Sequence, residues 1–194
     1  MNPPELILAS SSPFRKELLQ RLHIEFKTIS PDIDETHKES ESPTQYVKRL
    51  ALEKAQAIAV THPDSIVIGS DQCAYLDGII LGKPGNHQNA VQQLHNARNQ
   101  EVVFYTGLCV VQSSTQFCEV DCIEFRVGFR DISDQQIEHY LNVEQPYNCA
   151  GSFKSEGYGV CLFSYLKGDD PSALMGLPLI RLITMLEQTG LKVV

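Results

Sequence analysis

Long hydrophobic runs are missing from this sequence. No apolar segment approaches the roughly 20 residues that a membrane-spanning helix requires, so we expect no membrane partner. The amino terminus, Met1 to Leu6, lacks the basic start and the long apolar segment of a secretory signal. The sequence therefore predicts a cytoplasmic protein.

Positive charge is also scarce. The chain has 16 Lys and Arg residues against 24 Asp and Glu residues, which gives a formal net charge of −8. Proteins that bind nucleic acid derive much of their affinity from clustered Lys and Arg side chains that neutralise phosphates. The composition therefore argues against a large nucleic-acid surface, and any basic groups that contact phosphate should be few and local.

The cysteines follow no pattern typical of a metal site or of a disulfide framework. Cys118 and Cys122 lie four residues apart without a CxxC motif or a His partner pattern, which argues against zinc. All 6 cysteines lie in apolar, strand-like contexts of a chain with no secretory signal. Reduced thiols in the core are therefore the better interpretation.

The overall composition is that of an ordinary globular protein. Hydrophobic residues make up 42% and charged residues 21% of the 194 residues. This length allows one sizeable core, or two small lobes that share one cleft. Internal repeats, low-complexity tracts and linkers are not evident, so we treat residues 1–194 as a single domain.

The stretch from Ser65 to Pro84 organises the chain. Ser65 to Gly69 is a short, partly β-branched apolar run typical of a buried strand. Asp71 follows it, at the end of the strand where open α/β sheets hold their ligands. Asp77-Gly78 is a hairpin signal that would return Lys83 toward Asp71. This pair could bind a metal and an anion, or could form only a salt bridge at the surface.

The amino-terminal segment has the features of an anion site. Leu6 to Ser10 is predicted as a buried strand, and a helix from Pro13 to about Leu22 follows, with Ser12 as its N-cap. Arg15 falls on the apolar stripe of this helix. A guanidinium, helix N–H groups and serine hydroxyls would then converge, as a phosphate site requires. Alternatively, Arg15 extends to solvent from the first helical turn.

A second inward-facing cation is predicted on the longest helix. This helix begins at Ser42-Pro43 and runs to about Thr61, and Lys54 lies within its apolar stripe. A buried lysine is costly unless an anion meets it. Two such departures from the hydrophobic pattern, at Arg15 and Lys54, indicate a functional site more strongly than either alone.

An acidic loop at 31–42 precedes the longest helix. Asp32, Asp34 and Glu35 come directly after a predicted strand at 24–30. Acidic loops are commonly just solvated. Carboxylates at the end of a strand can also supply oxygen ligands to a metal ion.

The rest of the chain continues the mixture of strands and helices. The pattern predicts a strand pair at 101–112 and 117–129 and a further strand at 160–163. It predicts helices at 86–97, 133–141 and 177–188, the second with a capping box and the third with Gly190 as its C-terminal cap. We therefore expect a mixed α/β fold, in which helices flank a mixed sheet.

Six short motifs, in this order and spacing, resemble those of the Maf-like nucleotide pyrophosphatase family. The resemblance extends from Leu6 to Leu179. It implies the Maf-like fold, with two lobes that enclose a central cleft. The motifs are Ser10-Ser-Ser-Pro-Phe-Arg15, Asp34-Glu35, Glu53-Lys-Ala55, Gly69-Ser-Asp-Gln72, Gly82-Lys-Pro84 and Ala150-Gly-Ser-Phe-Lys-Ser-Glu-Gly-Tyr-Gly159.

The resemblance also implies an activity. Members of this family cleave nucleoside triphosphates to the monophosphate and pyrophosphate with a divalent metal cation. We therefore expect a small-molecule nucleotide as the substrate, Mg²⁺ or Mn²⁺ as the cofactor and, by family habit, a homodimer. The chain would remove modified nucleotides from the cellular pool.

Three positions bear on which nucleotide is cleaved. The family branch directed at dTTP and UTP has Arg, Thr and Gln where this sequence has Phe14, Gln72 and Glu156. This trio resembles the branch that acts on 7-methyl-GTP. Methylation at N7 puts a positive charge on guanine, which favours an aromatic face such as Phe14 and a nearby carboxylate. Glu156 can also accept hydrogen bonds from the N1–H and N2–H₂ edge of guanine.

Hydrolysis of a phosphoanhydride sets requirements that the remaining motif residues can meet. The phosphate charge must be neutralised, a water molecule must be held in line and a group must take its proton. As in the family, we expect Asp71 to accept that proton. Free aspartate has a pKa of about 3.9 and is a weak base at neutral pH, so the metal must share the work. We assign the triphosphate to Arg15, Lys54 and Lys83, assisted by Ser10 and Ser12, and the metal to Glu35 and Asp71.

Other functions stay open at this point. The enzyme could act on unmodified or pyrimidine triphosphates, or the chain could be a nucleotide-binding regulator linked to septum formation, from which the family takes its name. A phosphatase of the aspartyl-phosphate type is disfavoured, because Asp71 lacks the DxD spacing. Lys154 either contacts phosphate or supports its loop.

Overall fold

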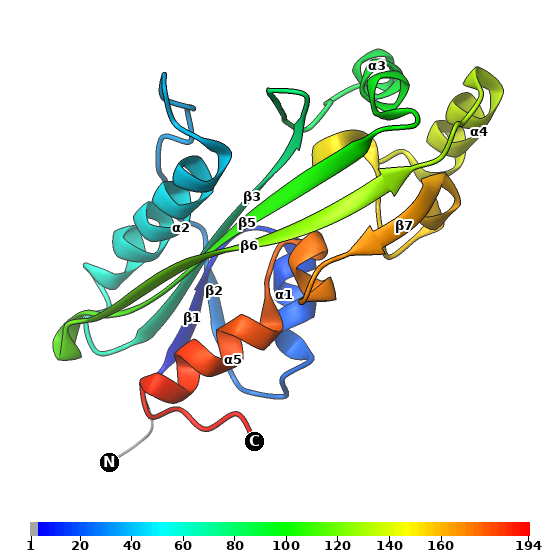
Figure 1. The fold of residues 1–194 in the computed structure, drawn as a ribbon. Helices are drawn as coiled ribbons and strands as arrows, with labels where there is room; N and C mark the ends of the chain where they lie inside the picture. Colours follow the sequence, from blue (N-terminus) through cyan, green and yellow to red (C-terminus); the bar gives the residue numbers. More distant parts are fainter. Residues whose placement is uncertain (1–3) are drawn as a thin grey trace. The chain divides into compact units, whose positions relative to one another are not determined.

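The computed structural model describes residues 4–194, whose strands form one seven-stranded sheet in the order β2-β1-β3-β5-β6-β7, with β4 paired to β3 off this path (Figure 1). β1 is parallel to β2 and β3, whereas β3 and β4, and β6 and β7, are antiparallel. The predicted mixed α/β fold is confirmed. The strands are β1 (Leu6–Ala9), β2 (Lys27–Ile29), β3 (Ile66–Leu76), β4 (Ile79–Leu81), β5 (Glu101–Gln112), β6 (Phe117–Phe129) and β7 (Phe163–Lys167).

Five α-helices and four short 3₁₀ segments accompany these strands within the described residues. The α-helices are α1 (Pro13–Gln20), α2 (Pro43–Ala59), α3 (His87–Ala97), α4 (Asp134–Glu144) and α5 (Leu179–Gln188). The 3₁₀ segments are η1 (Ser113–Thr115), η2 (Ala150–Ser152), η3 (Tyr158–Leu162) and η4 (Pro171–Met175). None of the helices in this part of the chain is long and apolar enough to cross a membrane.

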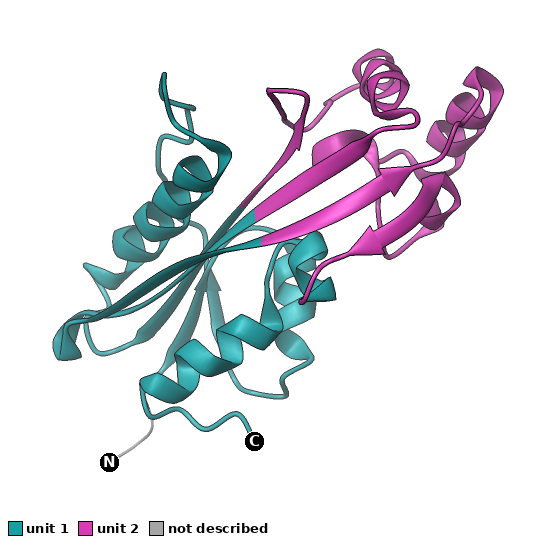
Figure 2. Cartoon of the chain, in the orientation of Figure 1, with its two compact units in different colours: residues 1–71, 106–123, 170–194 teal, residues 72–105, 124–169 magenta. Residues whose placement is uncertain are grey.

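The chain divides into two compact units (Figure 2). Unit 1 comprises residues 1–71, 106–123 and 170–194, and unit 2 comprises residues 72–105 and 124–169. Sections of β3, β5 and β6 belong to each unit, and β3 passes from unit 1 to unit 2 after Asp71. The division agrees with the expectation of two lobes.

Unit 1 packs helices on both faces of its part of the sheet. Successive side chains of β1 point to opposite faces, as strand geometry requires. Leu6 and Leu8 pack in a cluster with residues of α1 and α5, whereas Ile7 and Ala9 pack in a second cluster with residues of α2. Figure 1 shows α2 on one side of these strands and α1 and α5 on the other. Burial of these apolar side chains supplies the main stabilisation of unit 1.

Two glycines let α2 lie directly against the sheet. A Cβ atom on Gly69 of β3 would lie 2.1 Å from the carbonyl oxygen of Ala51 in α2. A Cβ atom on Gly107 of β5 would lie 2.2 Å from the carbonyl oxygen of Val47. Only glycine fits at such close approaches of two backbones. The glycines therefore set the distance between α2 and the strand that carries Asp71.

Unit 2 is built around a cluster of phenylalanine rings. Phe153 contacts Phe104, Phe129 and Phe163 edge to face, with ring centroids 5.3, 5.6 and 4.8 Å apart. Edge-to-face packing is favoured because the positive ring edge meets the negative ring face. Phe153 thereby joins the segment around residue 153 to β5, β6 and β7 in unit 2.

Several local expectations are confirmed. Ser12 caps α1, and Ser42 and Ser133 form capping boxes at the starts of α2 and α4. The turn at Asp77-Gly78 joins β3 and β4 as an antiparallel hairpin, with positive φ at both turn residues. This is the backbone conformation that the tightest hairpin turns require.

Three expected element positions are wrong. β3 does not end before Asp71 but continues to Leu76, so Asp71 lies within the strand, two residues beyond the last pairing of β1 with β3 at Gly69. β2 is limited to Lys27–Ile29 instead of 24–30. Residues 158–162 form η3, and the expected strand at 160–163 is replaced by β7, which begins at Phe163.

Candidate active site

Lys54 contacts two carboxylates of unit 1, one buried and one exposed. Its ammonium nitrogen lies 2.6 Å from Asp71 Oδ1 and 2.8 Å from Glu35 Oε1. Lys54 is 5% exposed and Asp71 is 8% exposed, whereas the Glu35 side chain is 56% exposed. The predicted inward orientation of Lys54 is confirmed. A buried cation requires such partners, because an unpaired buried charge is strongly disfavoured.

Arg15 belongs to the same cluster of charges. It is half-buried, and its Nε donates a hydrogen bond of 2.8 Å to the carbonyl oxygen of Gly176. Burial lowers the pKa of Arg15, and the carboxylates of Asp71 and Glu35 act in the opposite direction. Arginine nevertheless stays protonated at physiological pH. Arg15 and Lys54 therefore bring two positive charges to the same pair of carboxylates.

The carbonyl group of Gly176 is shared between two donors. Besides Arg15, the hydroxyl of Ser70 lies 2.9 Å from this oxygen and 2.8 Å from the carbonyl oxygen of Gly107. Ser70 is fully buried, next to Asp71 in β3. Gly176 has a φ of +98°, a conformation that favours glycine. The segment between η4 and α5 thus fixes the side chain of Arg15.

The serines of the first motif surround the start of α1. Ser12 accepts a hydrogen bond of 3.4 Å from the backbone N–H of Arg15, and its own N–H donates to Ser10 Oγ at 3.1 Å. Ser10 is buried at the end of β1, and Phe14 in the first turn is half-buried. The start of a helix favours anions because backbone N–H groups point outward there.

The loop that carries Glu35 is fixed to α2 by side chains that sequence analysis did not single out. Tyr46 donates a hydrogen bond of 3.0 Å to the carbonyl oxygen of Glu35. Arg49 binds both carboxylate oxygens of Glu41, at 2.5 and 2.9 Å, and donates to the carbonyl oxygen of Thr36 at 3.0 Å. The hydrogen bond from Arg49 lowers the pKa of Glu41 to about 2. Such bidentate pairs are among the stronger interactions of side chains.

The predicted site residues of unit 2 come from two segments that are fixed to each other. Lys83 is exposed, and the carbonyl groups on either side of it accept hydrogen bonds from α3, Gly82 from Gln93 at 3.1 Å and Pro84 from Asn89 at 2.9 Å. Ser152 donates to Gln93 at 2.5 Å and so links the Lys83 segment to the Gly- and Ser-rich segment.

The half-buried thiol of Cys149 lies within range of the charges of Lys83 and Glu156. Burial raises the pKa of Cys149 to about 11, and among the nearby charges Glu156 raises it further while Lys154 and Lys83 lower it. All of these groups belong to unit 2. The hydrogen bonds of Gln93 with Ser152 and with Gly82 accordingly place the segment at 149–159 beside the loop that carries Lys83.

Lys154 supports its loop. Its ammonium nitrogen lies 2.9 Å from Glu144 Oε1 and 3.2 Å from the carbonyl oxygen of Glu144. Its backbone N–H donates to the hydroxyl of Tyr140 at 3.1 Å. The loop is therefore fixed to the end of α4.

Two carboxylates in unit 1 fit a hard divalent cation. Asp71 and Glu35 are close enough for the single Lys54 nitrogen to contact both. Mg²⁺ is commonly held by one or two carboxylates together with water and substrate phosphate oxygens. No cluster of three or more His, Cys, Asp and Glu side chains suited to a metal occurs among residues 4–194.

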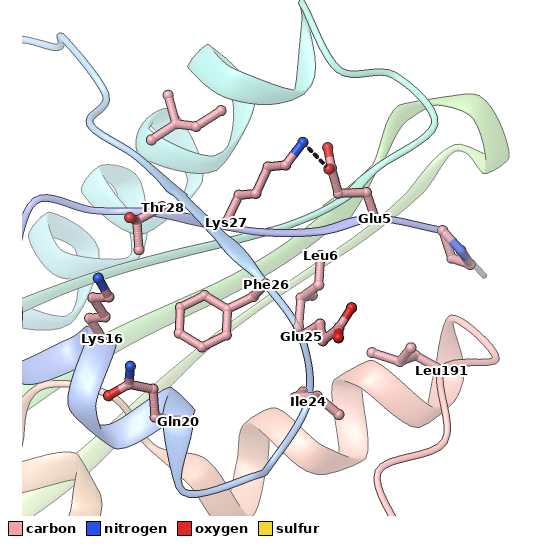
Figure 3. Close-up of a pocket in the computed structure, with 12 residues that line it drawn as sticks. Glu5, Leu6, Lys16, Gln20, Ile24, Glu25, Phe26, Lys27, Thr28 and Leu191 are labelled. Atoms are coloured by element: carbon pink, nitrogen blue, oxygen red, sulfur yellow. Dashed lines mark ion pairs between the residues drawn. The ribbon is translucent and has the colours of Figure 1, made fainter. Parts of the chain in front are cut away.

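A separate groove of about 990 Å³ lies in unit 1 beside the edge strand β2 (Figure 3). Lys27 and Glu5 form an ion pair there, and Phe26 lies beside them. None of the predicted site residues lines this groove. Its lining residues are Pro4, Glu5, Leu6, Lys16, Gln20, Ile24, Glu25, Phe26, Lys27, Thr28, Ile29 and Leu191.

Comparison with known proteins identifies the class to which this fold and these charged motifs belong. The family described as Maf-like protein matches residues 5–189, which include nearly all of both units. The chain belongs to the Maf-like protein family, and the resemblance inferred from the motifs is confirmed.

Curated relatives share about half of their residues with this chain. A protein of Methylobacillus flagellatus is 53% identical over 98% of this chain and 100% of its own length, and one of Pseudomonas syringae pv. tomato is 53% identical over 98% and 99%. A Pseudomonas aeruginosa protein is 50% identical over 98% and 99%. All three are named 7-methyl-GTP pyrophosphatase. Among solved structures, a HAM1 protein from Coxiella burnetii covers 79% of this chain and 89% of its own at 12% identity and a TM-score of 0.44.

Proposed function

We propose that this protein is a nucleoside triphosphate pyrophosphatase that hydrolyses 7-methyl-GTP to 7-methyl-GMP and pyrophosphate. The observation that carries the proposal is the contact of buried Lys54 with Asp71 and Glu35, with Arg15 beside them. The names of relatives that are 50–53% identical over nearly the whole chain support the choice of nucleotide. The family match over residues 5–189 supports one functional domain made of both units.

The cations of unit 1 suit the negative charge of a triphosphate. Lys54 offers a compact ammonium, and Arg15 offers a planar guanidinium that can contact two phosphate oxygens at once. Ser10, Ser12 and the N–H groups at the start of α1 add hydrogen-bond donors. We also assign Lys83 of unit 2 to the triphosphate, on the basis of its place in the Gly82-Lys-Pro84 motif.

Asp71 and Glu35 would hold the divalent cation, Mg²⁺ or Mn²⁺, and Asp71 would take the proton of the attacking water. The bond that forms joins the water oxygen to phosphorus, and the bond that breaks joins the α-phosphate to pyrophosphate, which leaves with the electron pair. When bound, the cation neutralises phosphate charge and makes a bound water more acidic. Lys54 keeps the carboxylate of Asp71 in place within β3.

Phe14, Gln72 and Glu156 are proposed to select the base. The charged N7-methylguanine ring prefers an aromatic face and a carboxylate to neutral partners. Glu156 is exposed in unit 2, and Phe14 is half-buried in unit 1. Both side chains therefore have surface available for a ligand.

Hydrolysis of a nucleotide panel tests the proposal. The purified protein is incubated with 7-methyl-GTP, GTP, dTTP and UTP in Mg²⁺ or Mn²⁺, and the products are separated by anion-exchange chromatography. We expect 7-methyl-GMP and pyrophosphate as the main products. Preference for a pyrimidine triphosphate would overturn the choice of substrate, and nucleotide binding without pyrophosphate release would favour a regulator. Light scattering of the same sample tests the expected homodimer.

Asp71→Asn tests the assignment of the proton acceptor. This variant should lose turnover by at least about a hundredfold, because general acid–base catalysis commonly contributes that much. It should still bind the nucleotide, because the amide keeps the shape of the side chain and Lys54 and Arg15 remain. Near-normal hydrolysis by this variant would contradict the role given to Asp71.

A further inference from the structure

The side chain of Glu144 ties together two residues on either side of Glu156. Glu144 is the last residue of α4, and its carboxylate is 16% exposed. One carboxylate oxygen accepts a hydrogen bond from Lys154 Nζ at 2.9 Å, and the other accepts one from the backbone N–H of Tyr158 at 2.8 Å. Burial would raise the pKa of Glu144, but these donors outweigh it and hold the pKa below its ordinary value.

The loop between these two contacts is closed by its own backbone. The carbonyl oxygen of Lys154 accepts hydrogen bonds from the N–H groups of Gly157 at 3.4 Å and Gly159 at 3.1 Å. A Cβ atom on Gly159 would lie 2.2 Å from that oxygen, and one on Gly157 would lie 2.9 Å from Glu144 Oε2. Glycine is therefore required at position 159 for the loop to close, whereas at position 157 a side chain would displace the carboxylate of Glu144.

The contacts of Tyr140 hold the same loop from the side of α4. Its hydroxyl accepts the backbone N–H of Lys154 at 3.1 Å, and its ring stacks on that of Tyr158 with centroids 6.0 Å apart. Tyr140 is fully buried. Both ends of the short loop are thus fixed to α4, whereas the side chain of Glu156 at its middle is exposed and accepts a hydrogen bond from Ser155.

We propose that Glu144 is a positioning residue for base selectivity, because its carboxylate holds Lys154 and Tyr158 and thereby fixes the place of Glu156. This inference rests on the proposed function, in which Glu156 contacts the base. A charge-assisted contact to a planar base edge depends on geometry, and a carboxylate held in place before binding loses less conformational freedom. Glu144 would act on the substrate only through Glu156.

Glu144→Gln tests this role with little change in shape. The amide removes the charge and presents an NH₂ group to one of the two donors, so the loop loses at least one of its ties. We measure kcat and KM for 7-methyl-GTP and for GTP, together with the melting temperature. The preference for 7-methyl-GTP, as the ratio of the two kcat/KM values, should fall by about fivefold or more, mainly through KM for 7-methyl-GTP. A merely structural role would lower both activities together and leave the ratio unchanged.

Two substitutions of Lys154 provide a second arm in case Glu144→Gln does not fold. Lys154→Met removes the cation that binds Glu144 and should reduce the preference as Glu144→Gln does. Lys154→Arg keeps a cation that can bind the carboxylate and should keep most of the preference. Glu187→Gln in α5 of unit 1 removes a glutamate charge elsewhere and serves as the matched control.

The outcomes separate this inference from the proposed function. Failure of the wild-type protein to prefer 7-methyl-GTP would overturn the proposed substrate. A wild-type preference that persists in Glu144→Gln, or that is equal in Lys154→Met and Lys154→Arg, would overturn the positioning role and leave the proposed function intact.

Discussion

Replacement of Lys54 by methionine removes the cation from a buried ion pair. Methionine keeps the length and the apolar character of the lysine stem, so the main change is the loss of the ammonium group. Asp71, at 8% exposure, would then lack the partner that lies 2.6 Å away in the native protein. Glu35 would lose the same partner, but its side chain is 56% exposed and can be hydrated instead.

The expected cost lies at the lower end of the range for such changes. Removal of one partner of a buried ion pair typically destabilises a protein by about 3–5 kcal/mol, because the other charge stays buried. Arg15 lies within charge range of Asp71 and offsets part of this cost. We therefore expect a loss of about 3 kcal/mol in the free energy of unfolding for Lys54→Met.

A double-mutant cycle distinguishes the ion pair from ordinary packing. In Lys54→Met/Asp71→Asn neither residue is charged, and the free energy of unfolding should return to within about 1–2 kcal/mol of the native value, because replacing both charges is often nearly neutral. Urea unfolding followed by circular dichroism measures all four proteins. Lys48→Met, on the same helix but only half-buried, is the control and should change stability little.

Additive effects of the two substitutions would contradict this prediction. If Lys54→Met cost less than about 1 kcal/mol, or if the double variant were as unstable as the sum of the two single variants, then the contact with Asp71 would not be a coupled, buried ion pair. The same variants separate stability from binding, because both Lys54→Met and the double variant should bind nucleotide more weakly than Asp71→Asn does.

Three other perturbations test the surroundings of this cluster. Gly69→Ala should destabilise the protein by about 1–3 kcal/mol by overpacking, because its Cβ would meet the carbonyl oxygen of Ala51 at 2.1 Å. Gly82→Ala, which has open space around its Cβ, is the control. Equal urea midpoints for the two variants would contradict the close approach of α2. The pKa of Glu41 is about 2 in the folded protein against an ordinary value of 4.5, so its contribution to stability is fully present above about pH 4.5 and is lost as pH falls toward 2. Glu41→Gln should therefore reduce the dependence of the free energy of unfolding on acid pH in urea titrations. An unchanged pH profile would contradict the contact with Arg49. Arg49→Gln should free the loop that carries Glu35 and weaken Mn²⁺ binding severalfold. A paramagnetic-resonance titration without substrate measures this affinity, and Arg21→Gln is the control that should leave it unchanged. Equal Mn²⁺ affinities of the two variants would exclude this role for the loop contacts.

Local signals in the sequence predict much of this fold. Capping residues, the Asp77-Gly78 turn and the periodicity of α2 each depend on a few neighbouring residues, and all are found in the structure. The apolar run at residues 65–69 does not predict that Asp71 lies within β3, because hydrophobicity indicates which residues are buried and not where backbone pairing ends. Ser70 and Asp71 are buried although they are polar, and β3 continues through both residues.

The error after Gly159 has a different physical origin. Val160-Cys-Leu-Phe163 is apolar and resembles a buried strand. In the structure, the hydrogen-bonded loop at residues 154–159 leads directly into the 3₁₀ segment η3. The strand that follows, β7, has mostly exposed side chains, including the apolar Tyr165 and Leu166, so its residues do not show the alternation of a half-buried strand. It is nevertheless held in the sheet by backbone pairing with β6.

The inward cations of unit 1 could be predicted because they violate a helical pattern. Arg15 and Lys54 each fall on an apolar stripe, and the structure brings both to the carboxylates of Asp71 and Glu35. The residues that hold the site could not be found in this way. Tyr46 and Arg49 act on a loop some ten residues away, and Gly176 reaches Arg15 across 161 residues of sequence. Contacts of this kind depend on the tertiary fold and leave no local periodicity.

The hydrogen bond between Arg15 and the Gly176 carbonyl restricts which amino acids can serve at position 15. One nitrogen of the guanidinium is committed to the protein's own backbone, yet the group has two further nitrogens to offer a ligand. Lysine carries a single nitrogen at the end of a flexible stem and would have to divide it between anchorage and recognition. The side chain at position 15 must therefore bind the protein backbone and still offer donors to a ligand. Among the cationic amino acids, only arginine can do both.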